Sequence, residues 1–418
     1  MQIIREAVHV ADYEVIVAGG GVAGVAAAVS ARRMGAKTLL IEKTIGLGGL
    51  ATTGLIHFFV PMCNGRGVRI IKGMAEELLR LSVRYGFDTI PEPWKNGDPK
   101  KGETARYITR FSGPLFTLAL TEFVLEEGVD LLFDTIITDV RMEGNICRGL
   151  VVENKSGCEY YGAGMVIDAT GDGDVLVRAG VPTVTGKNFH TYQALGADLE
   201  SCARAVEQRD ISRLYEYRFS GGNADLYGGN HPADKPLRSG TTVKDVTEYV
   251  IENQLECLDK IRGDNRFERT ILALPSMPQF RTTRHIVGEY TLQVEDAWRH
   301  FEDSVAAICD FDRRDYLYEV PYRTLYDGNY PNLMTAGRSA SAEGYAWDVL
   351  RVIPPAILTG QAAGIACAMA QAEGCAVRSV DIRKLQEELA RQDVMIHFDD
   401  ALIPETEAED VRADIGHI

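Results

Sequence analysis

The sequence predicts an α/β fold built on a parallel sheet, with an additional α+β domain inserted into the chain. Three observations lead to this prediction. A strand, a helix and a second strand follow one another near the N-terminus, glycine-rich segments come directly after predicted strands, and the central part of the chain mixes strands and helices without a visible repeat. The length of 418 residues is typical of two to three domains.

Composition and charge narrow the class of protein. Hydrophobic residues make up 45% and charged residues 25%, as in an ordinary globular protein. The net charge of −16 without a basic block argues against non-specific binding of nucleic acid or of an anionic membrane. The 8 cysteines are widely spaced and form no C-x-x-C pair, so we expect reduced thiols and neither a zinc ribbon nor a dithiol redox motif.

Targeting and membrane signals are weak. The first ten residues lack the continuous apolar core of a secretory signal. The longest apolar region, residues 349–370, is interrupted by Arg351 and by two prolines, which argues against a membrane span. We therefore expect a cytoplasmic protein without a membrane partner. Whether the chain forms a homo-oligomer is left open.

The N-terminal elements form a β–α–β unit. Residues 14–18 (EVIVA) are a short β-branched run, residues 22–34 are alanine-rich with helical spacing, and residues 38–42 (TLLIE) are a second apolar run. Such a unit of about thirty residues implies parallel strands joined by a right-handed crossover. The pattern predicts a Rossmann-like half-domain at the start of the chain.

The glycine cluster between the first strand and the first helix matches G-x-G-x-x-G at residues 19–24. Gly19 permits a tight turn, Gly21 lets the backbone approach a pyrophosphate, and Gly24 lets the helix pack closely on the strand. The helix N-terminus offers free N–H groups and a partial positive charge to the phosphates. Glu42, 18 residues after Gly24, can accept hydrogen bonds from ribose hydroxyls. Together these features predict dinucleotide binding and leave NAD and FAD both open.

The remaining elements follow in chain order. Further helices are expected at residues 74–85, 113–128, 355–373 and 380–391. Further strands are expected at residues 130–134, 136–152, 159–167 and 331–336. The hairpins between 136 and 167 indicate a β-meander, and the proline- and lysine-rich residues 91–104 indicate an exposed loop.

Three later clusters favour FAD over NAD. Residues 48–54 (GGLATTG) follow Glu42 closely, residues 168–174 (DATGDGD) follow a predicted strand, and residues 332–338 (NLMTAGR) end another strand. Small residues also gather in the last long helix, at Gly360, Ala362, Ala363 and Gly364. We interpret these glycines as places where the backbone comes close to a bulky cofactor.

The chain resembles the FAD-dependent oxidoreductase family of the two-dinucleotide-binding-motif flavoproteins, which share the glutathione-reductase-like fold. Four segments carry the resemblance: GGGVAG with Glu42-Lys43 and GGLAT, DATGDGDV at 168–175, R-x-x-R-x-I-x-G-x-Y at 281–290, and PYR…NLMTAGR…RV…TGQAAG at 321–364. The resemblance implies a Rossmann-like FAD-binding domain and a tightly bound FAD.

On this basis the chain divides into two intertwined domains. The FAD-binding domain is expected at residues 1–175, with a lid-like insertion at about 55–110, and again at residues 323–400. A substrate domain is expected at residues 176–322, and residues 401–418 are expected to form an acidic tail.

The resemblance also implies which residues hold the FAD. The N-terminal unit would bind ADP, the turn at 168–174 and Gly337-Arg338 would line the pyrophosphate and ribityl, and the helix near residues 354–356 would point its N-terminus at the flavin. The expected FAD-binding residues are Gly19, Gly21, Val22, Ala23, Gly24, Glu42, Lys43, Gly48, Gly49, Leu50, Ala51, Thr52, Ala169, Thr170, Gly171, Asp172, Gly337, Arg338, Arg351, Pro355 and Ala356. No metal-binding residue is expected.

Three candidates for catalysis lie in the motifs of the resemblance or beside them. His57 follows GGLAT and is either a base near the flavin or a structural histidine. Arg281 and Arg284 match R-x-x-R, so one of them is expected to bind an anion or a carbonyl, or to form a buried ion pair with Glu289.

Tyr345 and Asp348 are two further acid/base candidates, in a loop near the flavin-facing helix. Relatives often carry a small residue followed by Thr-His-Glu at this place, whereas this chain reads Ala342-Glu343-Gly344-Tyr345. The usual histidine position is Gly344, so chemistry assigned to that histidine does not transfer to this chain.

The leading hypothesis is a soluble FAD enzyme that moves a hydride between a small organic substrate and flavin N5, by CH–OH or C–H oxidation or by C=C reduction. An NAD-linked Rossmann dehydrogenase and a non-catalytic flavin-bearing redox or scaffold protein are the alternatives. A covalent flavin bond through His57 or Cys63 is also left open. The substrate, the direction of the reaction and the separate electron donor or acceptor stay undefined.

Overall fold

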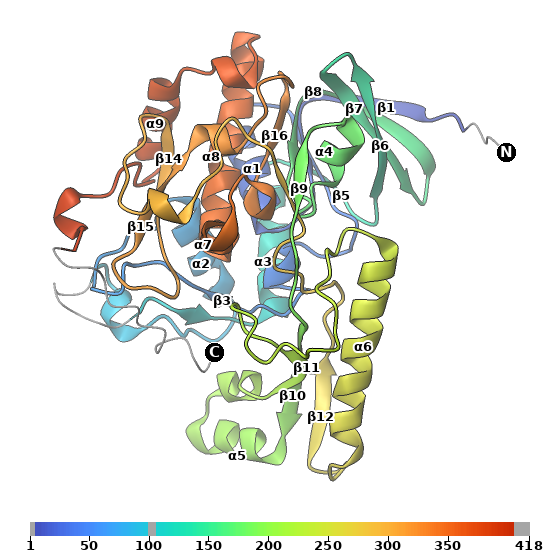
Figure 1. Cartoon of the computed structure of the whole chain (residues 1–418), viewed down its shortest axis with the longest axis vertical. Helices are drawn as coiled ribbons and strands as arrows, with labels where there is room; N and C mark the ends of the chain where they lie inside the picture. Colours follow the sequence, from blue (N-terminus) through green and yellow to red (C-terminus); the bar gives the residue numbers. More distant parts are fainter. Residues whose placement is uncertain (1–4, 99–105, 405–418) are drawn as a thin grey trace.

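A seven-stranded sheet runs through the larger lobe, with its meander at the upper right edge in Figure 1. This computed structural model describes residues 5–98 and 106–404. The sheet runs in the order β5 (Asp130–Leu132), β2 (Thr38–Ile41), β1 (Val8–Ala18), β8 (Gly157–Asp168), β7 (Ile146–Asn154) and β6 (Ile136–Glu143), and β16 (Leu333–Thr335) also pairs with β8. The pairs between β5, β2, β1, β8 and β16 are parallel, whereas β6, β7 and β8 form an antiparallel meander. The predicted parallel sheet with a β-meander is therefore confirmed.

The N-terminal β–α–β unit is present, with α1 (Val22–Arg33) between β1 and β2. The first strand is longer than predicted, because it begins at Val8 and not at residue 14. Residues 8–13 (VHVADY) mix apolar and polar side chains, and Val8 and Val10 are 66% and 47% exposed, so the continuous apolar run that indicates a buried strand begins only at Val15. Pairing with β8 extends the strand instead, starting at Val8 opposite Glu159.

The long helix α8 (Ile353–Glu373) packs against α1 through small residues. A Cβ atom on Gly360 would lie 2.2 Å from the Ala23 carbonyl oxygen, and one on Gly364 would lie 2.2 Å from that of Ala27. The close approach at these two glycines is to α1. Our interpretation that they lie against the cofactor is therefore wrong, and they are needed for helix packing.

Helix α8 is also the one helix of the described chain that is long and apolar enough to cross a membrane. Of its apolar window, 89% is buried inside the protein. This burial is typical of a core helix in a soluble protein.

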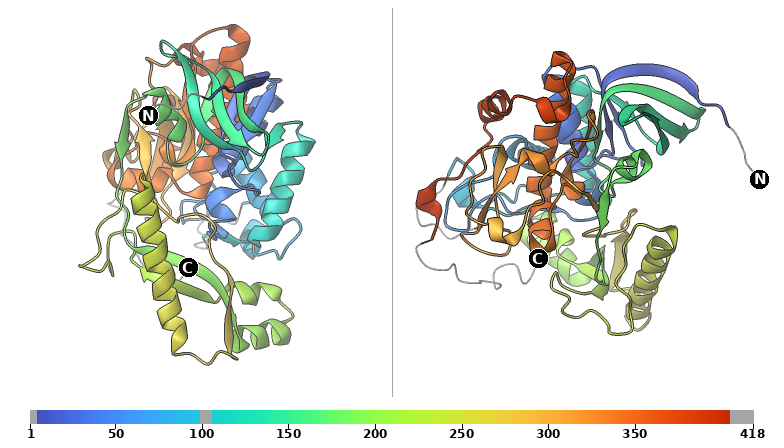
Figure 2. Two further views of the ribbon diagram at one scale, coloured as in Figure 1. Left: turned by 90° about the vertical axis from the view of Figure 1, so that its right-hand side faces the viewer. Right: turned by 45° about the horizontal axis from the view of Figure 1, so that its top comes forward.

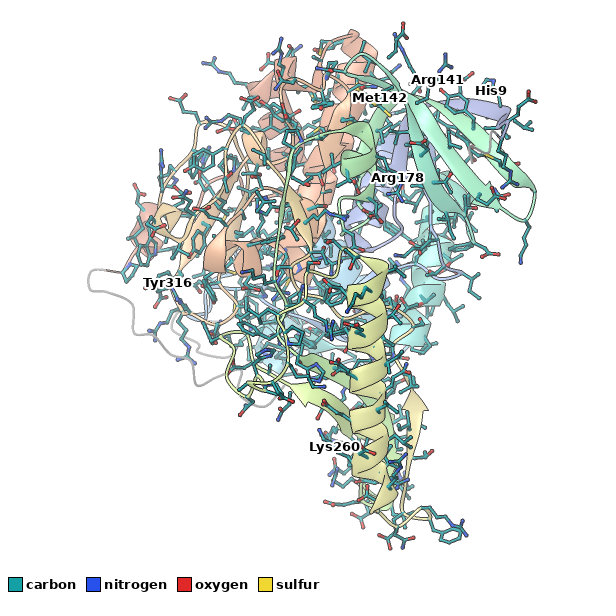
Figure 3. All side chains as sticks on the ribbon, turned by 45° about the vertical axis from the view of Figure 1, so that its right-hand side comes forward. His9, Arg141, Met142, Arg178, Lys260 and Tyr316 are labelled. Atoms are coloured by element: carbon teal, nitrogen blue, oxygen red, sulfur yellow. The ribbon has the colours of Figure 1, made fainter. Side chains whose placement is uncertain are left out.

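The inserted lobe consists of an antiparallel sheet and two helices. The sheet order is β11 (Arg218–Asn223), β10 (Thr191–Asp198) and β12 (Arg269–Ala273), with α5 (Leu199–Gln208) and α6 (Val243–Arg262) beside it. Figures 1 and 2 show that α6 and this sheet project from the larger lobe. Lys260, labelled on α6 in Figure 3, donates from Nζ to the carbonyl oxygens of Ser220 (2.7 Å) and Gly221 (2.8 Å), which fastens α6 to β11.

The hairpin of β14 (Ser304–Cys309) and β15 (Leu317–Pro321) was expected in the substrate domain, but it packs in the larger lobe. Val305, Ile308 and Leu317 are fully buried in the same core cluster as α1 and α8. The chain returns to the larger lobe at β13 (Arg284–Ile286), which pairs with β9 (Thr183–Thr185). The packing therefore ends the inserted lobe before residue 284, because the hairpin covers α8 and not the lobe.

Helices α2 (Met74–Val83), α3 (Gly113–Glu126) and α9 (Ile382–Arg391) match the predicted ones within a few residues. The short helices α4 (Asp174–Ala179) and α7 (Gly344–Leu350) and the strands β3 (Phe58–Phe59) and β4 (Thr109–Arg110) are not among the predicted elements, because they are too short to show a periodic pattern. Of the predicted loop at 91–104 and the predicted acidic tail at 401–418, residues 99–104 and 405–418 lie outside the described residues.

Candidate active site

A cavity of about 610 Å³ opens along the carboxyl ends of the parallel strands. Gly19 follows β1, Glu42 follows β2, Ala169 follows β8 and Ala336 follows β16, and all four line the cavity. Ligands of open α/β sheets bind at this edge, because the helix N-termini and the loops converge there.

The three motif glycines have different surroundings. Gly19 has φ +99°, and its Cβ would lie 2.6 Å from the Ala169 carbonyl oxygen. A Cβ on Gly24 would lie 1.8 Å from the Gly19 carbonyl oxygen. A Cβ on Gly21 would meet no protein atom within 4 Å, and Gly21 lines the cavity. Gly19 and Gly24 therefore serve the turn itself, whereas Gly21 leaves space for a ligand.

Glu42 is buried at the edge of this cavity and is held in place by the backbone. Its two carboxylate oxygens accept hydrogen bonds from the amides of Gly20 (2.7 Å) and Thr44 (2.8 Å). Each oxygen keeps a further lone pair, so the side chain can still accept ribose hydroxyls.

Next to Glu42, the meander and α4 form a wall that the sequence did not reveal. Ile136 and Ile137 of β6 line the cavity there, and so does Arg178 of α4. Arg178 is labelled in Figure 3. Arg178 donates to the Thr138 carbonyl oxygen (3.1 Å), which fastens α4 to β6. The cavity lining at this place is therefore formed by the meander and α4, outside the glycine motifs.

Asp168 organises the second glycine turn, at residues 168–174. One of its oxygens accepts from the Thr170 amide (3.0 Å), and the other accepts from the amides of Val175 (2.9 Å) and Leu176 (3.0 Å) at the start of α4. This fully buried carboxylate therefore holds the turn that carries Ala169, Thr170 and Gly171 into the cavity wall.

Arg338 fastens the same turn to the inserted lobe. Its guanidinium donates to the Gly171 carbonyl (2.7 Å), to the Asp172 carboxylate (2.7 Å) and to the Phe280 carbonyl (2.5 Å). Because these donors are already engaged, Arg338 contributes to the cavity mainly as part of its wall.

The N-terminus of α8 also reaches the cavity, where Val352, Ile353 and Ala356 line it. The first turn of this 21-residue helix carries a partial positive charge. Such a charge stabilises the negative charge of a reduced flavin.

Most of the expected FAD-binding residues meet in this one cavity. Those that line it are Gly19, Gly21, Val22, Ala23, Glu42, Lys43, Gly48, Gly49, Leu50, Ala51, Ala169, Thr170, Gly171, Gly337, Arg338, Arg351 and Ala356. Those outside its lining are Gly24, Thr52, Asp172 and Pro355. The open space at Gly21 and the helix N-termini fit a bound FAD.

The cavity continues past the nucleotide cradle into a chamber that faces the inserted lobe. Phe58 and Phe311 come from the larger lobe, whereas Gln193 and Met277 come from the insertion. No motif in the sequence marks these side chains as part of the site. Thr191 and Gln193 are two apart on β10 and so share a face, but alternation alone does not tell which face meets the cavity.

Arg281 lines this chamber and Arg351 lies close to it. Arg281 donates to the carbonyl oxygens of Asp225 (2.8 Å) and Ala224 (3.4 Å), and no carboxylate within residues 5–98 and 106–404 forms an ion pair with it. Burial lowers the pKa of Arg281, and the charge of Arg351 lowers it further. Arg351 instead pairs with Asp348 at 2.5 Å.

Arg284 lies outside the cavity lining, although it is only three residues from Arg281. It donates to the carbonyls of Asp172 (3.2 Å) and Thr241 (3.0 Å) and lies 3.4 Å from the Asp174 carboxylate. These contacts give Arg284 a positioning role behind the glycine turn. The Glu289 carboxylate, considered as its partner, accepts the Gly328 amide instead.

His57 is buried behind the cavity wall. Its Nε2 lies 3.2 Å from the Thr52 carbonyl, and its ring packs so closely on Gly113 that a Cβ there would lie 2.2 Å from Nε2. Burial lowers the pKa of His57 to about 4, so the ring is neutral near pH 7. Neither His57 nor the buried Cys63 lines the cavity, which places both away from a flavin bond.

Tyr345 and Asp348 lie on the short helix α7 and not in the predicted loop, and both lie outside the cavity lining. The Tyr345 hydroxyl donates to the Asp310 carboxylate (2.7 Å), and burial together with Asp310 raises its pKa. Asp348 orients Arg351 through their ion pair. In this structure both residues support the site from behind.

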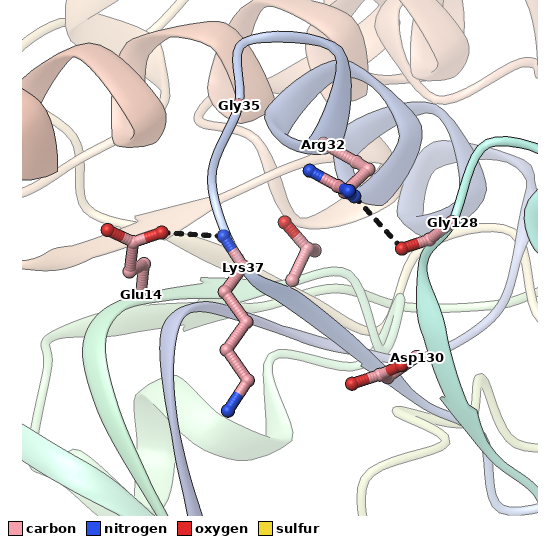
Figure 4. Close-up of a pocket in the computed structure, with 7 residues that line it drawn as sticks. Glu14, Arg32, Gly35, Lys37, Gly128 and Asp130 are labelled. Carbon is pink, nitrogen blue, oxygen red and sulfur yellow. Dashed lines mark hydrogen bonds between the residues drawn. The ribbon is translucent and has the colours of Figure 1, made fainter.

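A second, smaller hollow of about 270 Å³ lies at the amino ends of the strands (Figure 4). Its polar groups are already used by the protein: Glu14 accepts the Lys37 amide (2.6 Å) and Arg32 donates to the Gly128 carbonyl (3.0 Å). This end of the sheet lacks the converging helix N-termini, so the large cavity is the better active-site candidate.

One family of known proteins matches most of this chain. The model of a family described as FAD dependent oxidoreductase matches residues 14–216 and 241–389. A comparison with curated proteins gives no match. Among solved structures, a geranylgeranyl bacteriochlorophyll reductase-like protein from Thermoplasma acidophilum is 16% identical over 92% of this chain and 84% of that protein, with a TM-score of 0.48. A flavoprotein/dehydrogenase from Cytophaga hutchinsonii is 13% identical over 91% of this chain and 84% of that protein, with a TM-score of 0.43.

The family match covers most of the chain and includes both halves of the cradle. It confirms FAD as the cofactor and the protein as an enzyme, and it removes the NAD-linked and non-catalytic alternatives. The chain belongs to the FAD-dependent oxidoreductase family.

Proposed function

We propose that this flavoenzyme transfers a hydride between flavin N5 and a small anionic organic substrate, and that Arg281 binds the anionic group. Bound FAD would accept or supply the hydride. The proposal depends on one observation: Arg281 lines the chamber beyond the FAD cradle and, within the described residues, forms no ion pair with a carboxylate.

The charge of Arg281 supports an anionic partner. A partly buried guanidinium that only carbonyl oxygens contact is poorly neutralised, as the lowered pKa of Arg281 reflects. A substrate carboxylate would supply the missing charge and can bind a guanidinium through two hydrogen bonds. Arg351 is close enough to add to the positive potential, although Asp348 already neutralises much of it.

The rest of the chamber suits a carbon skeleton. Phe58, Met277, Phe280 and Phe311 present apolar surface, which excludes water from a reacting C–H or C=C bond. The Gln279 side chain donates to the Gly54 carbonyl (2.7 Å) in the larger lobe and to the Gln193 carbonyl in the inserted lobe. These two bonds hold the walls of the chamber in a fixed position relative to each other.

The test is an anaerobic screen of flavin bleaching and reoxidation with small carboxylates and the matching neutral amides. Wild-type enzyme is expected to react with a carboxylate and not with its amide. Arg281→Gln is expected to keep its FAD but to lower kcat/KM about 100-fold, the size of a lost two-bond charged contact. Arg266→Gln, an exposed arginine of the same lobe, is the matched control and should behave like wild type. Unchanged kcat/KM in Arg281→Gln would contradict the proposal.

We also propose that the enzyme works in the cytoplasm, without a membrane or nucleic-acid partner. The net charge of −16 and the burial of α8 support this placement. Recovery of the protein in the membrane pellet after cell fractionation would contradict it.

A further inference from the structure

A cluster of two histidines and one glutamate lies outside the cavity described above. His300 precedes β14, Glu319 lies on β15, and His397 follows α9. One ligand atom from each residue lies within 4.8 Å of the others. Glu319 is 19 positions from His300 and 78 positions from His397, so the three residues form no local sequence motif.

Glu319 is the centre of this cluster. Its side chain is 0% exposed, and its Oε1 lies 2.5 Å from His300 Nδ1 and 3.0 Å from His397 Nδ1. Its other oxygen accepts the Phe301 amide at 2.7 Å, which fixes the orientation of the carboxylate. A rigid carboxylate oxygen is thus presented to two imidazole nitrogens at once.

His300 lies between two carboxylates. Its Nδ1 faces Glu319, and its Nε2 lies 2.8 Å from the Asp400 carboxylate. In a metal complex Nδ1 would give its lone pair to the ion, while Nε2–H would donate to the Asp400 carboxylate. Histidine ligands of metals are commonly oriented by such a carboxylate.

We propose that His300, His397 and Glu319 bind a divalent transition-metal ion of the zinc type, with Asp400 positioning His300. Two imidazole nitrogens and one carboxylate oxygen are a ligand set typical of Zn²⁺, which also takes a water in its fourth position. Tetrahedral bonds of about 2.1 Å place neighbouring ligand atoms roughly 3.4 Å apart. Small rotations of the two rings, which are 40% and 47% exposed, open the present spacing to that value and leave a path for the ion.

The position of the cluster indicates a structural role for the ion. His397 belongs to the segment after α9, which reaches the hairpin through the bond from the Ser304 hydroxyl to the Ile396 carbonyl (2.7 Å). A metal ion shared by His397, Glu319 and His300 would clamp this segment to β14 and β15. None of the three ligands lines the FAD cavity, so metal binding and FAD binding are separable.

The experiment uses FAD-loaded enzyme stripped with a chelator and then titrated with Zn²⁺ against a competing dye, with elemental analysis for stoichiometry. Co²⁺ gives an independent optical signal. Wild type is expected to bind one ion per chain and to gain thermal stability from it. His397→Ala is expected to bind at least 100-fold more weakly while keeping its FAD, because this half-exposed side chain can be removed without opening the core.

The matched control is His9→Ala, since among the described residues the one carboxylate that His9 pairs with is that of Asp12, at 3.0 Å. This variant should bind Zn²⁺ like wild type. Equal Zn²⁺ affinity in wild type and His397→Ala would overturn the proposal. It would also be overturned if wild type bound no ion while His397→Ala lowered the melting temperature, because the cluster would then act through protonated histidine alone.

Discussion

The two ends of the large cavity differ in which atoms line them, since backbone dominates at one end and side chains dominate at the other. The cradle end consists largely of backbone and small residues from a few short segments, such as the turns after β1 and β8. The chamber end consists of side chains such as Gln193, Arg281 and Phe311, which come from three distant parts of the chain. A cofactor used by a whole family can be held by local turns, whereas a particular substrate needs side chains that only the folded chain brings together.

The largest expected effects come from two glycines of the same cradle motif. Gly24→Val should give insoluble or unfolded protein, because its Cβ would lie 1.8 Å from the Gly19 carbonyl oxygen. Gly21→Val should fold but lose FAD affinity at least 100-fold, because its side chain would enter the space for the pyrophosphate. Circular dichroism and flavin content of the two purified variants separate these effects. If folded Gly21→Val still contains stoichiometric FAD, the pyrophosphate does not bind at Gly21 and the proposed FAD-binding cradle is wrong.

The next effect separates the two arginines of the R-x-x-R motif. Arg284→Ala should weaken FAD binding about tenfold, since this side chain supports the turn at Asp172 and Asp174, and charged hydrogen bonds of this kind contribute about 1.5–3 kcal/mol. At saturating FAD its turnover should approach that of wild type. Arg281→Gln should show the reverse, with FAD retained and kcat/KM lowered. If Arg284→Ala binds FAD normally but turns over slowly, Arg284 takes part in catalysis and does not merely support the turn.

The smallest effect concerns His57, which belongs to the layer behind the cavity. Its folded-state pKa of about 4 lies below the ordinary value of 6.5. Between these two pH values the imidazole is therefore protonated in the unfolded chain but neutral in the folded protein. The stabilising contribution of the neutral ring is complete above about pH 6.5 and is lost as the pH falls toward 4.

The corresponding variant is His57→Asn. Urea unfolding at about pH 7.5 and pH 5 should show a smaller loss of stability in this variant than in wild type. Turnover at pH 7.5 should stay within about twofold, as expected of a side chain that only supports the cavity wall. A variant with full FAD content and no turnover would instead make His57 catalytic.

Local patterns were enough to predict the N-terminal β–α–β unit, the β-meander and the long helix α8 of the larger lobe. The apolar runs of β1 and β2 and the alanine-rich α1 are determined by neighbouring residues, and so is the turn that contains Gly19 and Gly21. The prediction failed where pairing or packing with a distant segment decides the structure. The exposed start of β1 is ordered by β8, and the β14–β15 hairpin is held by α8 in the larger lobe.

The same division holds for the candidate site and the histidine cluster. Glycines such as Gly360 look alike in sequence whether a cofactor or a helix lies against them, and only the position of α1 shows that Gly360 packs on Ala23. His300 and His397 carried no signal, because their partner Glu319 is distant in the chain.

By itself, the sequence determined the Rossmann-like FAD cradle and the membership in a family of flavoenzymes, because phosphate-binding turns are made by consecutive residues. Only the tertiary structure decided that Arg281 faces the chamber while Arg284 supports the turn behind it. The two arginines have the same chemistry and lie three residues apart. The direction of each side chain depends on how the inserted lobe packs against the larger lobe, and residue order along the chain does not contain that information.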